Sequence, residues 1–249
     1  MAIKYRDDAD LEFLKDCDNE DLKVLADILI YKKNGKKRFT QELADERDFR
    51  HCNGDYQKVW DLIAGELQLY GGDSIINMVR RWKGVPYREI LENVCGKMRV
   101  NYNKKSPTEK IEMNLIMKVV EDALEKMSEE EKREVVKEMK LDVEQPTTQI
   151  IMASLQAAIK VGGFRAYEIA LIVANAISRA LFGKGLSFAA NAMLTRLMAI
   201  FAGPLGLIAN ILLTVPLITN TAYRVTIPAT IQVAYMRQKM LHGTEGESS

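Results

Sequence analysis

Few residues of this 249-residue chain could do chemistry, and none of them forms a complete catalytic motif. His51 and Cys52 are adjacent and could bind a metal ion, but they lack the second pair of ligands that a structural zinc site needs. The segment from Gly183 to Ser187 is similar to a phosphate loop, yet it lacks the leading glycine at the spacing of a P-loop. The sequence therefore predicts no enzyme, no metal or other cofactor and no small-molecule substrate.

Two charged features have alternative interpretations. Glu168 is the only acid between residues 146 and 241, and Arg165 precedes it by three positions. This spacing favours an ordinary ion pair on a helix surface over a proton relay. The loop from Asn34 to Arg38 is a small basic cluster, for which a solvated surface is the first interpretation. A phosphate or lipid-headgroup contact is the alternative.

The charges of the chain are divided unevenly between its two halves. The sequence has 35 Lys and Arg against 34 Asp and Glu, a formal net charge of +1. Before Pro146 there are 27 basic and 31 acidic residues, a net charge of −4, and from Pro146 onward 8 basic and 3 acidic, a net charge of +5. A chain without a strong overall positive charge is a poor match to nucleic-acid binding. Opposite signs would favour docking of one half on the other.

The cysteines and the first residues indicate where the chain resides. Cys17, Cys52 and Cys95 are far apart and form no paired motif, which is typical of reduced thiols in a cytoplasmic protein. The first residues are polar and acidic, unlike a signal or transit peptide. We expect a cytoplasmic protein, peripheral to or inserted at the inner membrane if its apolar half contacts lipid.

Residues 1–145 form the first expected domain, an acidic domain of several amphipathic helices. Apolar residues recur there at helical spacing, with starts near Asn19, Trp60 and Pro86. Capping boxes are expected at Ser106–Glu109 and Ser128–Glu131. Because no alternating strand pattern is present, the fold class is all-α.

Residues 146–241 form the second expected region, which is strongly apolar and interrupted by Gly and Pro, and residues 242–249 are expected to be a disordered tail. The longest uncharged run, Leu197 to Tyr223, has 27 residues, which exceeds the ~20 that span a bilayer. Pro204, Pro216 and Pro228 recur at intervals of 12 residues. Since each proline tends to kink or end a helix, a segment between two of them would cross only about half of the hydrocarbon layer.

Three arrangements of this apolar region are open: a transmembrane hairpin, helices that the N-terminal half shields until they meet a membrane, and a helical core or self-association surface without lipid. Tyr223 and Arg224 close the uncharged run, where an aromatic residue and a cation suit a membrane interface. Arg224 could equally pair with an acid of the N-terminal half. The candidate membrane or interface residues are Leu197, Phe201, Pro204, Leu213, Pro216, Tyr223, Arg224 and Pro228.

Three segments carry a resemblance to a known family: Asp8–Leu14, WDLIAGELQLYGGDSIINMVRRWKGVPYREIL from Trp60, and TAYRVTIPATIQVAYMR from Thr221. The parts LIAGELQLYGGDS and AYRVTIPA are the most specific. Through them the chain resembles the YaaW family of uncharacterised bacterial proteins. The segment from Trp60 to Val100 is more loosely similar to ubiquinol-cytochrome c assembly chaperones. These resemblances imply an all-α fold and a helical partner-binding module, and they supply no catalytic residue.

We therefore expect a non-enzymatic helical protein that associates with membrane lipid through its C-terminal half, forms oligomers or pores, and is regulated by its N-terminal half. The alternative is a soluble adaptor or assembly chaperone that binds a hydrophobic client through the apolar region. A homo-oligomer or a protein partner fits both hypotheses.

Overall fold

A computed structural model describes residues 3–71, 84–161, 163–187, 192–214 and 222–243. The described residues contain α-helices, short 3-10 helices and no strand, which confirms the all-α prediction. In the first half the α-helices are α1 (Asn19–Ile30), α2 (Arg47–His51), α3 (Trp60–Gly71), α5 (Tyr87–Met98), α6 (Thr108–Leu124) and α7 (Glu129–Glu138). In the second half they are α8 (Thr148–Val161), α9 (Phe164–Phe182), α10 (Ala192–Thr214) and α11 (Tyr223–His242).

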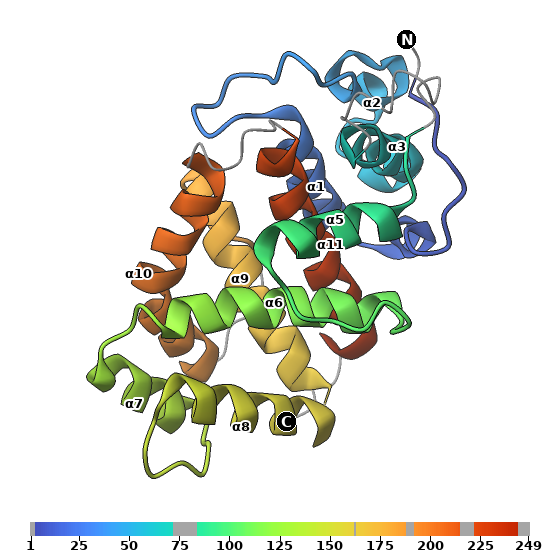
Figure 1. Ribbon diagram of the computed structural model, residues 1–249. Helices are drawn as coiled ribbons and strands as arrows, with labels where there is room; N and C mark the ends of the chain where they lie inside the picture. Colours follow the sequence, from blue (N-terminus) through green and yellow to red (C-terminus); the bar gives the residue numbers. More distant parts are fainter. Residues whose placement is uncertain (1–2, 72–83, 162, 188–191, 215–221, 244–249) are drawn as a thin grey trace.

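Helix α11 is the centre of the bundle (Figure 1), although it is the last helix of the described chain. It packs against α9, α1, α6, α5 and α3, and it is buried almost without interruption from Val225 to Met236. One apolar core cluster includes residues from both sides of position 145. The division at residues 145 and 146 stays a prediction, and residues 244–249 of the expected tail lie outside the described residues.

Helices α9 and α10 lie side by side and run in parallel (Figure 1). Asn175 contacts Met198 and Arg165 contacts Met193, so the pairs advance along both helices in the same direction. The chain after α9 turns back along that helix, where the amide of Leu186 donates to Asn175 Oδ1 at 3.0 Å. Helices α9 and α10 therefore do not form an antiparallel hairpin with each other.

The two prolines inside helices do not break them. Pro204 lies within α10 and Pro228 within α11, and both helices continue past the ring. The prediction that a proline ends the helix is therefore wrong at both positions. Each proline removes one backbone hydrogen bond, but both are buried among neighbouring helices, whose packing compensates for that loss. Pro216 lies outside the described residues.

One of the two expected capping boxes is present. Ser128 accepts from the amide of Glu131 at 3.2 Å, and Glu131 accepts from the amide of Ser128 at 2.7 Å. The box expected at Ser106 does not form, because Pro107 occupies the N-cap position and α6 begins at Thr108. For α1 the cap is Asp18, one residue before the predicted start.

Candidate functional site

The candidate residues in α10 lie mainly on its inner face. Leu197, Phe201 and Pro204 are buried against the rest of the bundle. The side chain of Leu213 lies outside the described residues, as does Pro216. The structure thus assigns three of the proposed contact residues to packing.

The outer face of α10 is apolar and exposed. Leu207 is 49% exposed and Ile211 is 40% exposed, and a Cβ added at Gly203 or Gly206 would meet nothing within 4 Å. Among the described helices, α10 alone has the length and composition to cross a membrane, over Ala192–Leu212, and 39% of its most apolar window is buried. Because α10 continues past Pro204, the 21 residues from Ala192 to Leu212 extend about 30 Å. The prediction that proline makes this segment too short is therefore wrong.

The three candidate residues of α11 lie in different surroundings. The ammonium of Lys97 lies 5.6 Å from the centre of the Tyr223 ring, a cation–π distance. Pro228 is buried in the centre of the bundle. Arg224 lines a cavity and, in the part of the chain that the structure describes, has no carboxylate partner. The predicted pairing of Arg224 with an N-terminal acid is therefore not found there.

Arg224 belongs to a surface that we call the basic end. It combines the loop after α1, the C-terminal ends of α9 and α10, and the start of α11, which meet around two adjoining cavities. Its cations are Lys32, Lys33, Arg38, Arg179, Lys184 and Arg224. Phe39, which is 99% exposed, lines one of these cavities, and the exposed Leu207 and Ile211 lie on α10 next to Asn210, which lines the other. Lys33 donates to Asn210 Oδ1, which connects the loop to α10.

A buried ion pair joins α11 to the N-terminal half. Arg237 Nε donates to Glu112 Oε2 at 2.7 Å, and Arg237 Nη2 donates to Glu112 Oε1 at 3.3 Å. The hydroxyl of Tyr87 donates to the same Oε1 at 2.7 Å. The Glu112 side chain is fully buried, and this burial raises its pKa against the lowering effect of Arg237. The guanidinium of Arg237 also lies 4.1 Å from the centre of the Phe13 ring.

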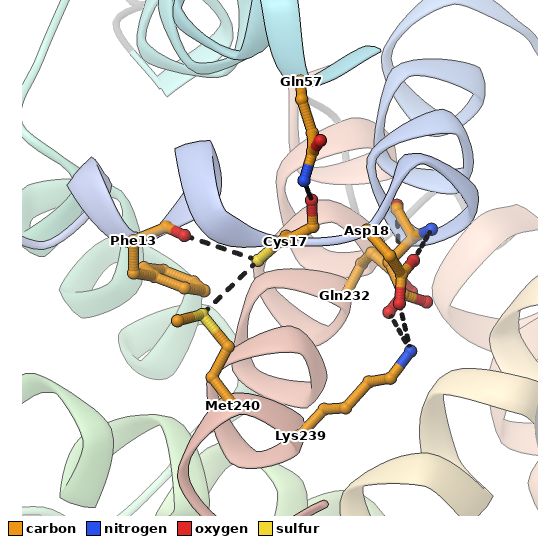
Figure 2. A network of polar contacts seen from close by, with 8 residues as sticks. Phe13, Cys17, Asp18, Gln57, Gln232, Lys239 and Met240 are labelled. Atoms are coloured by element: carbon orange, nitrogen blue, oxygen red, sulfur yellow. Dashed lines mark hydrogen bonds and ion pairs between the residues drawn. The ribbon is translucent and has the colours of Figure 1, made fainter. Parts of the chain in front are cut away.

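A second ionic contact lies near the C-terminal end of α11 (Figure 2). Lys239 Nζ reaches Asp18 at 2.6 Å and Asp21 at 2.7 Å, and Gln232 donates to the Asp21 carbonyl at 3.4 Å. Burial raises the pKa of Asp21 to about 6, whereas Lys239 holds the pKa of the more exposed Asp18 below its usual value. Both contacts join acids of the first half to cations of the second, as the charge division predicts.

Other candidates for chemistry have structural roles. Arg165 and Glu168 form the expected ion pair at 2.8 Å, but Glu168 is 1% exposed and so does not lie on the surface. The exposed His51 ring contacts the Arg47 carbonyl. No group of three potential metal ligands occurs in the described ranges.

Sequence reasoning missed two buried polar residues of α3. Glu66 is 1% exposed and accepts from the amide of Glu42 at 3.1 Å, and its burial raises its pKa to about 7. Gln68 bonds both the amide and the carbonyl of Arg6, at 2.9 and 2.8 Å. Polar residues within the apolar pattern from Leu62 to Tyr70 are the signal that could have identified them. They anchor the N-terminal segment to the core.

Comparison with known proteins gives two family matches within the chain. Residues 55–230 match the family model described as ubiquinol-cytochrome C chaperone, and residues 5–39 match a domain of unknown function, DUF3944. The class of the protein is therefore an all-α protein with a chaperone-type helical domain. No solved structure matches the chain.

The more specific relatives match the whole chain. A UPF0174 protein of Helicobacter pylori strain J99 is 41% identical over 100% of this chain and 98% of its own length. The UPF0174 protein YaaW of Escherichia coli strain K12 is 31% identical over 98% of this chain and 100% of its own length. The chain belongs to the UPF0174 family. Both the YaaW resemblance and the looser chaperone similarity are confirmed.

Proposed function

We propose that this protein is a non-enzymatic adaptor that docks, in its folded form, on an anionic membrane surface through the basic end. The observation that carries the proposal is the meeting of six cations and three exposed apolar residues at one end of the bundle. Each cation near an anionic surface contributes about 1 kcal/mol. Insertion of Phe39, Leu207 and Ile211 at the headgroup level would add apolar burial.

Peripheral docking agrees better with the core than insertion of the C-terminal half does. Insertion of α11 would break the contact between Arg237 and Glu112 and would expose its buried apolar surface. Breaking a buried ion pair typically costs about 3–5 kcal/mol. The folded protein would therefore lie on the cytoplasmic face of the inner membrane, without forming a pore.

A flotation experiment with the full-length chain tests this proposal. The unmodified protein should float with vesicles that contain phosphatidylglycerol and should not float with pure phosphatidylcholine. The variant K32Q/K33Q/K184Q removes three exposed cations of the basic end, so its partition coefficient should fall about 100-fold at low salt. The control variant K104Q/K105Q/K110Q removes three exposed cations between α5 and α6 and should float like the unmodified chain.

Three results would count against the proposal. Equal flotation of both triple variants would mean that the basic end is not the docking surface. Absence of flotation for the unmodified chain would exclude membrane docking. Dye leakage from the same vesicles would contradict the peripheral form, because a folded bundle at the surface should leave the bilayer intact.

A second candidate function rests on the match of residues 55–230 to the ubiquinol-cytochrome C chaperone model. In this alternative the outer face of α10 binds an apolar client protein or a second copy of the chain. The exposed Leu207 and Ile211 would be the contact residues. Suppression of the aggregation of an apolar client by the unmodified chain, and its loss in L207D/I211D with flotation retained, would favour this alternative.

A further inference from the structure

A cavity of about 570 Å³ opens at the basic end between the loop after α1 and the start of α11. Its described lining contains four cations, and no carboxylate occurs in that lining. The lining residues are Lys32, Lys33, Asn34, Arg38, Phe39, Thr40, Tyr70, Leu181, Arg224 and Val225. Such a lining is suited to an anion.

Two guanidinium groups in this cavity are close enough to repel each other. Arg38 is 9% exposed, and its Nε donates to the Ile28 carbonyl at 3.2 Å, which fixes the side chain. Burial lowers the pKa of Arg38, Tyr70 partly opposes this lowering, and the positive charge of Arg224 adds a smaller lowering. Buried cations are normally paired with an acid, and neither arginine has one among the described residues. A bound anion would offset both the burial of the Arg38 charge and its repulsion from Arg224.

One nitrogen donor of this cavity is unused by the described residues. Arg224 Nε is buried and has no hydrogen-bond partner within the described ranges. Thr40 Oγ1 and the Tyr70 hydroxyl lie 3.3 Å apart on the same lining, and the Tyr70 hydroxyl donates to the Leu29 carbonyl. Arginine forks match the oxygens of a phosphate group in a bidentate geometry.

We infer that this cavity binds a phosphate group, with Arg38 and Arg224 as its cationic ligands and Lys32 at the edge. The phosphate could belong to a lipid headgroup or to a small soluble molecule. The apolar side chains of Phe39, Leu181 and Val225 border the same cavity and would accept the start of a lipid tail. The soluble source is independent of membrane docking, whereas the lipid source rests on the proposed function.

The variant R224Q tests the inference, because Arg224 has no described polar contact whose loss would disturb the fold. The matched control is R196Q, which removes one arginine charge at the opposite end of α10, where Arg196 is exposed. The variant R224K retains the charge without the bidentate fork. Thermal unfolding of each variant confirms that the bundle is intact.

Titration calorimetry with inorganic phosphate and glycerol 3-phosphate measures binding of a soluble phosphate. Sedimentation with phosphatidylcholine vesicles, with and without phosphatidic acid, measures binding of a lipid phosphate. For at least one source, R224Q should bind at least about tenfold more weakly than the unmodified chain, which corresponds to the loss of a charge-assisted contact. R224K should be intermediate, and R196Q should be unchanged.

The outcomes separate this inference from the proposed function. If R224Q binds soluble phosphate and lipid phosphate as tightly as the unmodified chain does, the cavity is not a phosphate site. The same conclusion follows if R196Q loses as much affinity as R224Q. Retained flotation of R224Q on phosphatidylglycerol vesicles would then leave membrane docking in place. A tenfold loss confined to soluble phosphate, with no vesicle binding by the unmodified chain, would support the cavity and exclude docking.

Discussion

The ion pair between Arg237 and Glu112 should contribute more to stability than any exposed pair, because the Glu112 carboxylate is fully buried. The variant R237M keeps the length and apolar character of the side chain but removes the donors to Glu112, at 2.7 and 3.3 Å, and the 2.6 Å hydrogen bond from Nη2 to the Asp10 carbonyl. Tyr87 would then be the remaining described donor to the carboxylate. At ~1.5–3 kcal/mol for each charged hydrogen bond, we expect a loss of about 3–5 kcal/mol at pH 8.

The loss should depend on pH. Without Arg237 the pKa of Glu112 rises further, since burial is then less opposed. The carboxyl group of the variant becomes neutral as the pH falls, so the difference in stability from the unmodified chain should shrink between pH 8 and pH 5. The double variant E112Q/R237M removes both charges and should recover part of the loss.

Urea unfolding followed by circular dichroism measures these differences, and a double-mutant cycle isolates the coupling between the two residues. The control is R196M, since Arg196 pairs with Glu138 at 3.4 Å and is 67% exposed. Its cost should be below about 1 kcal/mol. A loss below 1 kcal/mol for R237M, or a loss that is the same at pH 5 and pH 8, would refute the reasoning about buried charge.

Three further predictions concern other parts of the fold. Burial raises the pKa of Glu66 from 4.5 to about 7, so the ionised Glu66 side chain lowers the stability of the fold. E66Q should therefore raise the free energy of unfolding by up to about 3 kcal/mol at pH 8 and change it little at pH 4. Urea unfolding at both pH values can check this prediction. Replacement of Ser128 by Ala removes a capping box and should cost about 1 kcal/mol, measured by the same method. Leu197→Ala should lower the free energy of unfolding by ~2–5 kcal/mol because Leu197 is fully buried. Leu207→Ala should change it by less than about 0.5 kcal/mol and should weaken vesicle binding. Urea unfolding measures the effect on stability, and flotation measures the effect on vesicle binding.

The docking of the two halves could be predicted from charge alone, because counts of acids and bases need no coordinates. Arg237 with Glu112, Lys239 with Asp18 and Asp21, and Arg196 with Glu138 all join the acidic half to the basic half. The particular partners could not be predicted, since they lie more than 50 positions apart in the chain and depend on how the helices cross.

The central position of α11 could not be predicted from its composition. The uncharged run from Leu197 to Tyr223 is the most apolar part of the chain, yet α10 has an exposed face. Helix α11 contains buried Thr230, Gln232 and Gln238 and three cations, yet it is the more buried helix. Burial depends on how many neighbouring helices surround an element, and single-sequence periodicity contains no record of those neighbours.

The basic end was only partly visible in the sequence. The loop from Asn34 to Arg38 is recognisably basic, and a phosphate or headgroup contact was its alternative interpretation. Arg179, Lys184 and Arg224 join it only because α9 ends beside this loop and α11 begins there. Their separation in sequence hides a cluster that exists only after folding.

Hydrogen exchange on the vesicle-bound chain tests folded docking through the basic end most directly. We predict that amides in α11 stay as protected as they are in solution, while protection increases in the loop from Lys32 to Thr40 and near Leu207 and Ile211 in α10. Loss of protection in α11 on binding would show that the bundle opens, and unchanged exchange in the loop would show that another surface meets the lipid. Either result would contradict the account.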